Sequence, residues 1–330
     1  MGEFEILKII WFLLIGILFI GYSILDGFDL GIGSLFPLIA KNDEERKKIF
    51  RIIGPFWDGN EVWLLTGGGA LFAAFPHAYA TVFSGFYLAF MFVLFALIAR
   101  AVSIDFWHHD ERRKKFWEWA FIIGSFLPSL LFGVALGNCI IGIPLNEKFD
   151  FTGNFFTLLR PYPLVMGILG LFMIMLHGTS YVVLKTDGEL RERGYRIART
   201  LWILFMVAFI LSFIVTVVWT PGFLGKITAW IFALMVILFW ILMGISINKK
   251  KNGLCFLFSS LLFINLWGIV GSIHFPYLVR ASNNPEYSLT IYNASSSPLT
   301  LKVMLLIAII GMPFVIGYTI YVYKIFKGRV

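Results

Sequence analysis

The sequence predicts an all-α, polytopic membrane protein with nine transmembrane helices. Of its 330 residues, 59% are hydrophobic and only 14% are charged, and the mean hydropathy is +0.85. A soluble domain has about 25% charged residues, so this chain has too few charges to cover a water-exposed surface. The same composition excludes disorder, and two cysteines are too few for a disulfide-stapled secreted scaffold.

Long segments without Asp, Glu, Lys or Arg are the second observation. They cover residues 9–25, 62–99, 120–146, 161–184, 200–225, 227–248, 252–279 and 303–323. A membrane-spanning helix needs about 20 mostly apolar residues, so seven of these runs fit one span each. As one helix, 62–99 would be roughly 57 Å long. It must therefore fold back, and Pro76 supplies the break because proline cannot continue a helical hydrogen-bond ladder.

These runs place nine spans in a single transmembrane domain covering residues 1–330. The predicted helices are 7–37, 54–75, 80–100, 117–139, 161–184, 200–219, 226–247, 253–273 and 302–325.

The cations are the third observation, because Lys and Arg favour cytoplasmic loops. Most of the 27 cations fall in the segments 41–51, 100–115, 185–199 and 249–251 and in the C-terminal tail, all on one side of this map. The remaining six lie on the other side: Lys8, Lys148, Arg160, Lys226, Arg280 and Lys302. We therefore expect the N-terminus outside and the C-terminus in the cytoplasm. The net charge of +8 orients the chain in the bilayer and does not indicate a nucleic-acid partner.

Four carboxylates fall inside predicted spans. Asp26 and Asp29 belong to the first helix, and Asp58 and Glu61 to the second, each pair three residues apart and so on one helix face. The connecting loop 41–51 is short, so we expect the acids to approach each other in the cytoplasmic half of the bilayer. Such residues usually face the bundle interior and often mark proton paths. Structural pairing is the alternative, and Arg100 at the inner end of the third helix is the candidate charge partner.

Aromatic and histidine residues give weaker signals. Trp57 and Trp63 flank the second acidic pair, where they seal it from lipid or pack against neighbouring helices. Among the five histidines only His177 lies well inside a span. A haem ligand must be an inward-facing side chain, so a single histidine inside a span is weak evidence for a haem or metal site in this chain.

Several motifs make the chain resemble subunit II of the cytochrome bd-type quinol oxidases. The longest are DGFDLG at 26–31, PFWDGNEVWL at 55–64 and GGALFAAFP at 68–76. Shorter matches are FSGFY at 83–87, GSF at 124–126, GNFF at 153–156 and FP at 275–276. The resemblance therefore runs along the whole chain.

This resemblance implies a fold of two four-helix bundles plus one peripheral helix. It also implies a heterodimer with a haem-bearing subunit I in a bacterial or archaeal cytoplasmic membrane. The complex oxidises quinol and reduces dioxygen to water. Two b-type haems and one d-type haem are expected in subunit I. This chain is expected to bind no cofactor directly. Whether a small single-helix subunit joins them stays open.

By carry-over onto matching positions, Asp58 is the first candidate for a cytoplasmic proton path. Asp26, Asp29 and Glu61 support it, and Trp63 is a candidate for a gas route. A secondary transporter with an intramembrane carboxylate cluster is the main alternative. Transporters usually carry broken helices in both halves, whereas all four acids here lie in the first two helices. A haem-carrying catalytic subunit is a second alternative, which the histidines oppose.

Overall fold

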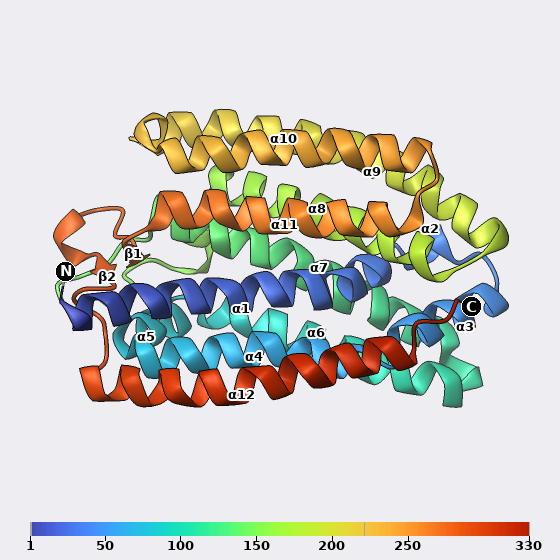
Figure 1. Ribbon diagram of the computed structural model, residues 1–330, viewed down its shortest axis with the longest axis horizontal. Coiled ribbons are helices and arrows are strands. Elements are labelled where there is room, and N and C mark those ends of the chain that lie inside the picture. The colour runs from blue at the N-terminus through green and yellow to red at the C-terminus, as the bar shows by residue number, and fades with distance from the viewer. Residues whose placement is uncertain (1, 221, 330) are drawn as a thin grey trace.

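A computed structural model shows a bundle of long helices that run nearly parallel to one another (Figure 1). It describes residues 2–220 and 222–329. The helices are α1 Glu3–Ser34, α2 Phe36–Ile39, α3 Asp43–Ile53, α4 Trp57–Ala74, α5 Pro76–Gly85, α6 Tyr87–His109, α7 Lys114–Ile141, α8 Pro161–Lys185, α9 Gly188–Trp219, α10 Ile227–Asn248, α11 Asn252–His274 and α12 Pro298–Ile325. The all-α, multi-pass membrane character predicted from composition is confirmed.

Helix α1 is the centre of the bundle. It contacts α4, α7, α8, α11 and α12, and its C-terminal part is buried from Asp26 to Ser34. Helices α9 and α10 form the edge farthest from α12 (Figure 1). Helix α12 forms the opposite edge, where it contacts α1 and α4.

Within the described residues, eight helices are long and apolar enough to cross a membrane. The ninth predicted span, α4, is not among them, because its first turns carry Asp58, Asn60 and Glu61. The break at Pro76 is confirmed, since α4 ends at Ala74 and α5 begins at Pro76. The count of nine spans and their grouping into two bundles remain predictions.

Several predicted boundaries are wrong. The segment 41–51, taken as a loop, is mostly the helix α3, which begins at the N-cap Asn42. The charged segment 188–199 is the first part of α9, and α6 continues to His109. Searching for charge-free runs cannot detect these parts, because helices that leave the membrane keep their hydrogen-bond ladder while their side chains become polar.

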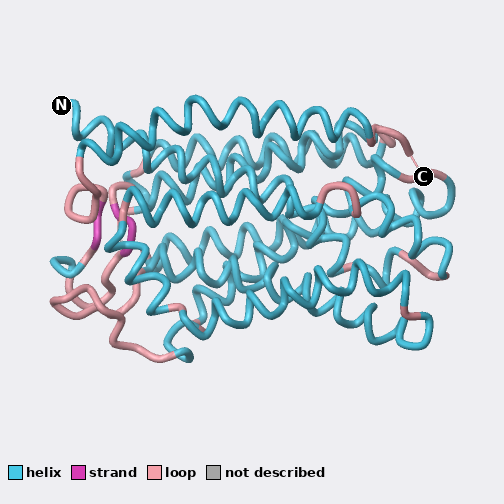
Figure 2. Tube along the Cα trace, turned by 90° about the horizontal axis from the view of Figure 1, so that it is seen from below, coloured by secondary structure: helices cyan, strands magenta, loops and turns pink. Residues whose placement is uncertain are grey.

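The connections from α7 to α8 and from α11 to α12 fold into a cap at the end where α1 starts. Its two short antiparallel strands, β1 Tyr277–Val279 and β2 Leu289–Thr290, lie there in Figure 2. Lys8 donates to the carbonyl of Tyr292 at 3.2 Å, and the Trp11 indole donates to the carbonyl of Leu301 at 3.0 Å. The cap and the start of α12 are therefore tied to the N-terminal half of α1.

Glycines bring α1 and α8 into direct backbone contact. A Cβ atom added to Gly178 would lie 2.6 Å from the carbonyl carbon of Gly31. Gly33 similarly leaves room for the side chain of Ser125 on α7. Lipid provides no hydrophobic force between membrane helices, so close packing of this kind stabilises them instead. It also encloses the inner half of α1.

Replacement of Gly31 by alanine should therefore destabilise the chain by about 1–3 kcal/mol or more, as overpacking does in other cores. Gly16→Ala is the matched control on the same helix, because nothing lies within 4 Å of its added Cβ. Fluorescence-detected size exclusion after heating the solubilised protein measures the difference. Equal melting of the two variants would contradict the contact.

Candidate functional site

Two of the predicted acids meet at Arg100, which α6 positions against α1 and α4. One guanidinium nitrogen, Nη2, donates to Asp26 Oδ1 at 2.8 Å and to Glu61 Oε1. The side chains of Arg100 and Asp26 are fully buried, while that of Glu61 is 25% exposed. Buried charges are tolerated only when they are paired. This ion pair therefore joins α1, α4 and α6.

Asp29 lies one turn further along α1 and has a neutral partner. The Asn60 amide Nδ2 donates to Asp29 Oδ2 at 2.8 Å and to the carbonyl of Leu25 at 2.9 Å. The hydroxyl of Tyr323, on α12, donates to Asn60 Oδ1 at 3.2 Å. Asp29 is 1% exposed. A single amide therefore links α1, α4 and α12 around this carboxyl group.

The cluster has unused hydrogen-bonding capacity. Among the described residues, no partner is found for the buried atoms Asp26 Oδ2, Asp29 Oδ1, Arg100 Nε and Nη1, or the hydroxyl of Tyr22. An unsatisfied buried polar group costs about 1–3 kcal/mol, so native proteins carry few of them. Their concentration here distinguishes this region from the apolar core around it.

Asp58 does not join the cluster. It lies in the first turn of α4, is exposed, and forms no hydrogen bond or ion pair within the described part of the chain. The prediction placed it one turn inside a helix starting at 54, but α4 starts at Trp57. A carboxylate at a helix N-terminus is stabilised by the helix dipole. Glu61 follows one turn later on the same face, between Asp58 and Arg100.

Trp63 and Trp57 both pack against neighbouring residues. The ring of Trp63 occupies the space that a Cβ on Gly21 would fill, which brings α4 close to α1. Trp57 is partly buried against the main core. A role of Trp63 in a gas route remains a prediction.

His177 does not fit a haem ligand, because both of its ring nitrogens are occupied. Nδ1 lies 2.7 Å from the Ser259 hydroxyl and Nε2 lies 2.8 Å from the carbonyl of Ile24. The ring is stacked on Phe256 with centroids 4.8 Å apart. Within residues 2–220 and 222–329, no three His, Cys, Asp or Glu side chains gather as a metal site would require.

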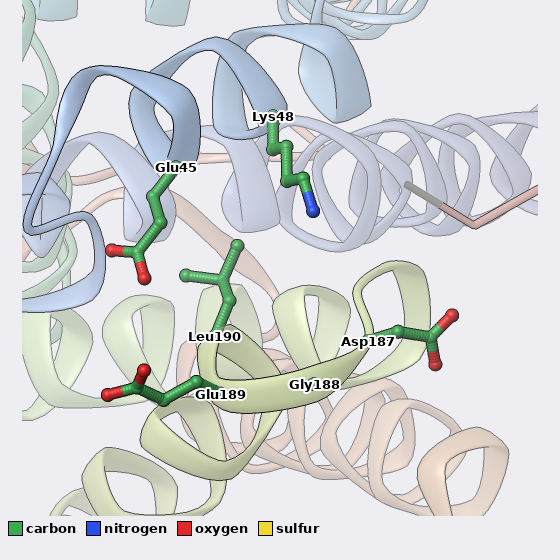
Figure 3. Close-up of a pocket in the computed structure, with 6 residues that line it drawn as sticks. All are labelled: Glu45, Lys48, Asp187, Gly188, Glu189 and Leu190. Atoms are coloured by element: carbon green, nitrogen blue, oxygen red, sulfur yellow. The ribbon is translucent and has the colours of Figure 1, made fainter.

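A separate pocket of about 340 Å³ lies at the inner end, between α3 and the start of α9. Figure 3 shows Glu45 and Lys48 of α3 on one side and Leu190 and Glu189 of α9 on the other. Arg193 donates to Glu45 at 2.6 Å and to the carbonyl of Ile39 at 2.6 Å. Burial alone would raise the pKa of Glu45, but the hydrogen bonds from Arg193 and from the backbone of Lys41, together with the charges of both residues, outweigh it, and the pKa is lowered. We interpret this contact as a tether between α3 and α9.

The sequence missed the polar residues that complete the cluster. Asn60 lies inside the motif at 55–64, so its position beside the acids was a usable signal. Tyr22 precedes Asp26 by one helical turn, which was a second signal. Tyr323 reaches Asn60 across 263 residues of sequence, and no local pattern indicates such a contact.

Comparison with known proteins identifies the family. The family model for cytochrome bd terminal oxidase subunit II matches residues 7–326. The chain belongs to this family. It is therefore a subunit of an oxidoreductase complex, and the resemblance inferred from the sequence motifs is confirmed.

Curated relatives agree along the whole chain. This subunit II chain is 35% identical to cytochrome bd-I ubiquinol oxidase subunit 2 of Escherichia coli (strain K12). The alignment covers 100% of this chain and 97% of the relative. The chain is also 35% identical to cytochrome bd ubiquinol oxidase subunit 2 of Bacillus subtilis (strain 168), covering 97% and 96% respectively.

The fold matches a solved bd oxidase from Geobacillus thermodenitrificans with a TM-score of 0.80. The match covers 97% of this chain and 98% of that chain at 17% identity, and so shows a shared fold.

We expect Arg100→Gln to destabilise the subunit by about 3–5 kcal/mol, because it leaves a buried carboxylate without its charge partner. The double variant Arg100→Gln with Asp26→Asn should recover much of that loss, since no unpaired charge then remains on Asp26. Thermal unfolding of the solubilised protein measures both. Lys47→Gln is the control, because its ion pair with Glu44 is exposed and is worth at most about 1 kcal/mol. A double variant less stable than Arg100→Gln would contradict the pairing.

Proposed function

We propose that this chain is the subunit of a quinol:dioxygen oxidoreductase that ligates no haem itself, and that it carries protons from the cytoplasm toward the site of oxygen reduction. It forms a heterodimer with a haem-bearing subunit I, which holds two b-type haems and one d-type haem. A small single-helix third subunit is compatible with this arrangement. The names of the relatives support quinol as the electron donor.

The cluster around Arg100 is the observation that carries the proton-path proposal. Reduction of dioxygen to water consumes protons, whereas oxidation of quinol releases them. If uptake is from the cytoplasm and release is outside, the reaction separates charge without a pump. Carboxyl groups inside the membrane suit such uptake, because they can accept a proton from water and pass it on.

The acids become more buried from Asp58 to Asp29, and this order supports a direction for proton movement. Asp58 is exposed at the inner end of α4, Glu61 is partly exposed, and Asp26 and Asp29 are buried. A proton entering at Asp58 then reaches Glu61 one turn later and moves through bound water, past the ion pair of Asp26, to the buried Asp29. The orientation with the N-terminus outside places this end of α4 in the cytoplasm.

The position of Glu61 also indicates which face of α4 the partner subunit covers. The neighbouring Val62 is 47% exposed and Leu65 is 72% exposed, so this face of α4 is otherwise apolar. A carboxyl group facing lipid tails is costly. We therefore place subunit I against this face of α4, where it covers Glu61. The proposal also includes nine membrane-spanning helices in a single domain, and a location in the bacterial or archaeal cytoplasmic membrane.

Asp58→Asn and Asp29→Asn should each slow quinol-driven oxygen consumption and proton uptake by about tenfold or more, as loss of a general acid or base does. Haem spectra of the purified complex should be unchanged, which shows intact assembly. Asp105→Asn is the control, because this acid lies on α6 outside the cluster. Unchanged proton uptake in both variants, with intact haems, would sink the proton-path proposal.

A further inference from the structure

The turn between α10 and α11 lies at the level of the lipid headgroups. It consists of residues 249–251, and both of the helices that it joins are apolar enough to cross a membrane. They are 22 and 23 residues long. At 1.5 Å per residue such helices are roughly 33–35 Å long, which barely exceeds a hydrocarbon core of about 30 Å. So short a turn therefore cannot extend far into the water.

A pocket of about 430 Å³ opens beside this turn. It is lined by three basic residues and by the first residues of α11: Lys250, Lys251, Arg329, Asn252, Gly253 and Leu254. The segment that carries Arg329 follows α12 and lies at the same end of the bundle as the turn (Figure 1). A Cβ atom added to Gly253 would meet nothing within 4 Å, so the pocket is open on this side. Its lining suits an anionic group.

The charges around the pocket leave an excess of positive charge. Lys250 donates to Glu192 of α9 at 2.7 Å, so an acid balances it. Arg329 lies 3.9 Å from Asp187, and both side chains are more than half exposed, which makes this pair weak. Lys251 forms no ion pair within residues 2–220 and 222–329. Lys251 and Arg329 can therefore pair with an anion in the pocket.

Helix α9 holds the turn in place from both ends. The hydroxyl of Tyr195, which is 6% exposed, donates to Asn252 Oδ1 at the start of α11. Arg199 donates to Asn248 Oδ1 at the end of α10, at 2.8 Å. A site whose backbone is already fixed loses less conformational freedom when a ligand binds. The pocket is therefore formed before any ligand enters it.

An exposed apolar stripe continues from the pocket along α11. Leu254 lines the pocket and is 42% exposed, Leu257 is 48% exposed and Ile264 is 39% exposed. Steps of three and seven residues keep side chains on one face of a helix. The stripe therefore runs from the headgroup level toward the middle of the bilayer. A free anion would use only the pocket, whereas a lipid would use the stripe as well.

We propose that this pocket binds the phosphate of an anionic phospholipid, such as phosphatidylglycerol, and that one acyl chain lies along the stripe of Leu254, Leu257 and Ile264. Lys251 and Arg329 pair with the headgroup, as basic pockets between membrane helices do with such lipids. The excess positive charge favours an anionic lipid over a zwitterionic one. In the orientation proposed above, the lipid belongs to the cytoplasmic leaflet. The site is separate from the acidic cluster, so the inference does not depend on the proton path.

The test is the binding of phosphatidylglycerol to the purified complex, measured by native mass spectrometry. Lys251→Gln combined with Arg329→Gln should weaken binding of the first lipid by about thirtyfold, because each basic residue near a membrane surface contributes about fivefold. Lys249→Gln combined with Lys327→Gln is the matched control. It removes the same charge from the same two segments, but neither side chain lines the pocket. Equal weakening by the two double variants would overturn the site.

A second measurement locates the lipid in the unaltered complex. Phosphatidylglycerol with a photoreactive diazirine in one acyl chain should cross-link to residues 253–264 of α11. Unlabelled phosphatidylglycerol should displace it better than phosphatidylcholine, and millimolar inorganic phosphate should not displace it. Cross-links confined to other helices, or equal displacement by both lipids, would count against the proposal. Displacement by inorganic phosphate would show that the pocket takes a free anion, and would overturn the assignment to a lipid.

Discussion

The ion pair between Arg100 and Asp26 is the constraint on which the inner half of the bundle depends. Neither side chain reaches solvent, so neither charge is tolerable without the other. Because the two residues come from α6 and α1, and Glu61 joins them from α4, the pairing fixes three helices at one point. Every other polar contact of the cluster is arranged around this point.

Close backbone packing makes this burial achievable. Gly31 and Gly178 let α1 and α8 meet without side chains between them, and Gly33 admits Ser125 from α7. Such contacts close the α7 and α8 side of this part of α1, and the hydrogen-bond partners of Asp26 and Asp29 come from α6 and α4 instead. The glycines and acids in the motif at 26–31 therefore act together, because the glycines allow the close packing that buries the acids.

The charge-free runs located the helices and the break at Pro76 because both follow from the cost of placing charges and unbonded backbone in lipid. They missed α3 and the first turns of α9, since a helix outside the membrane has no such cost. The pairing of Arg100 was foreseeable from its height in the bilayer, whereas Asp58 was misplaced by one turn. The contact between Tyr323 and Asn60 was not foreseeable, because it depends on where α12 packs.

The two buried aspartates cannot do the same job. Asp26 is held by a permanent cation, so protonating it would break an ion pair and leave the guanidinium with fewer partners. Asp29 accepts from a neutral amide on one oxygen, and its other oxygen has no partner among the described residues, so protonating it breaks no ion pair. The structure thus separates a buried ion pair, which holds the helices, from a neighbouring carboxyl group that has no charge partner, and the proposed proton path assigns the exchange of protons to the second.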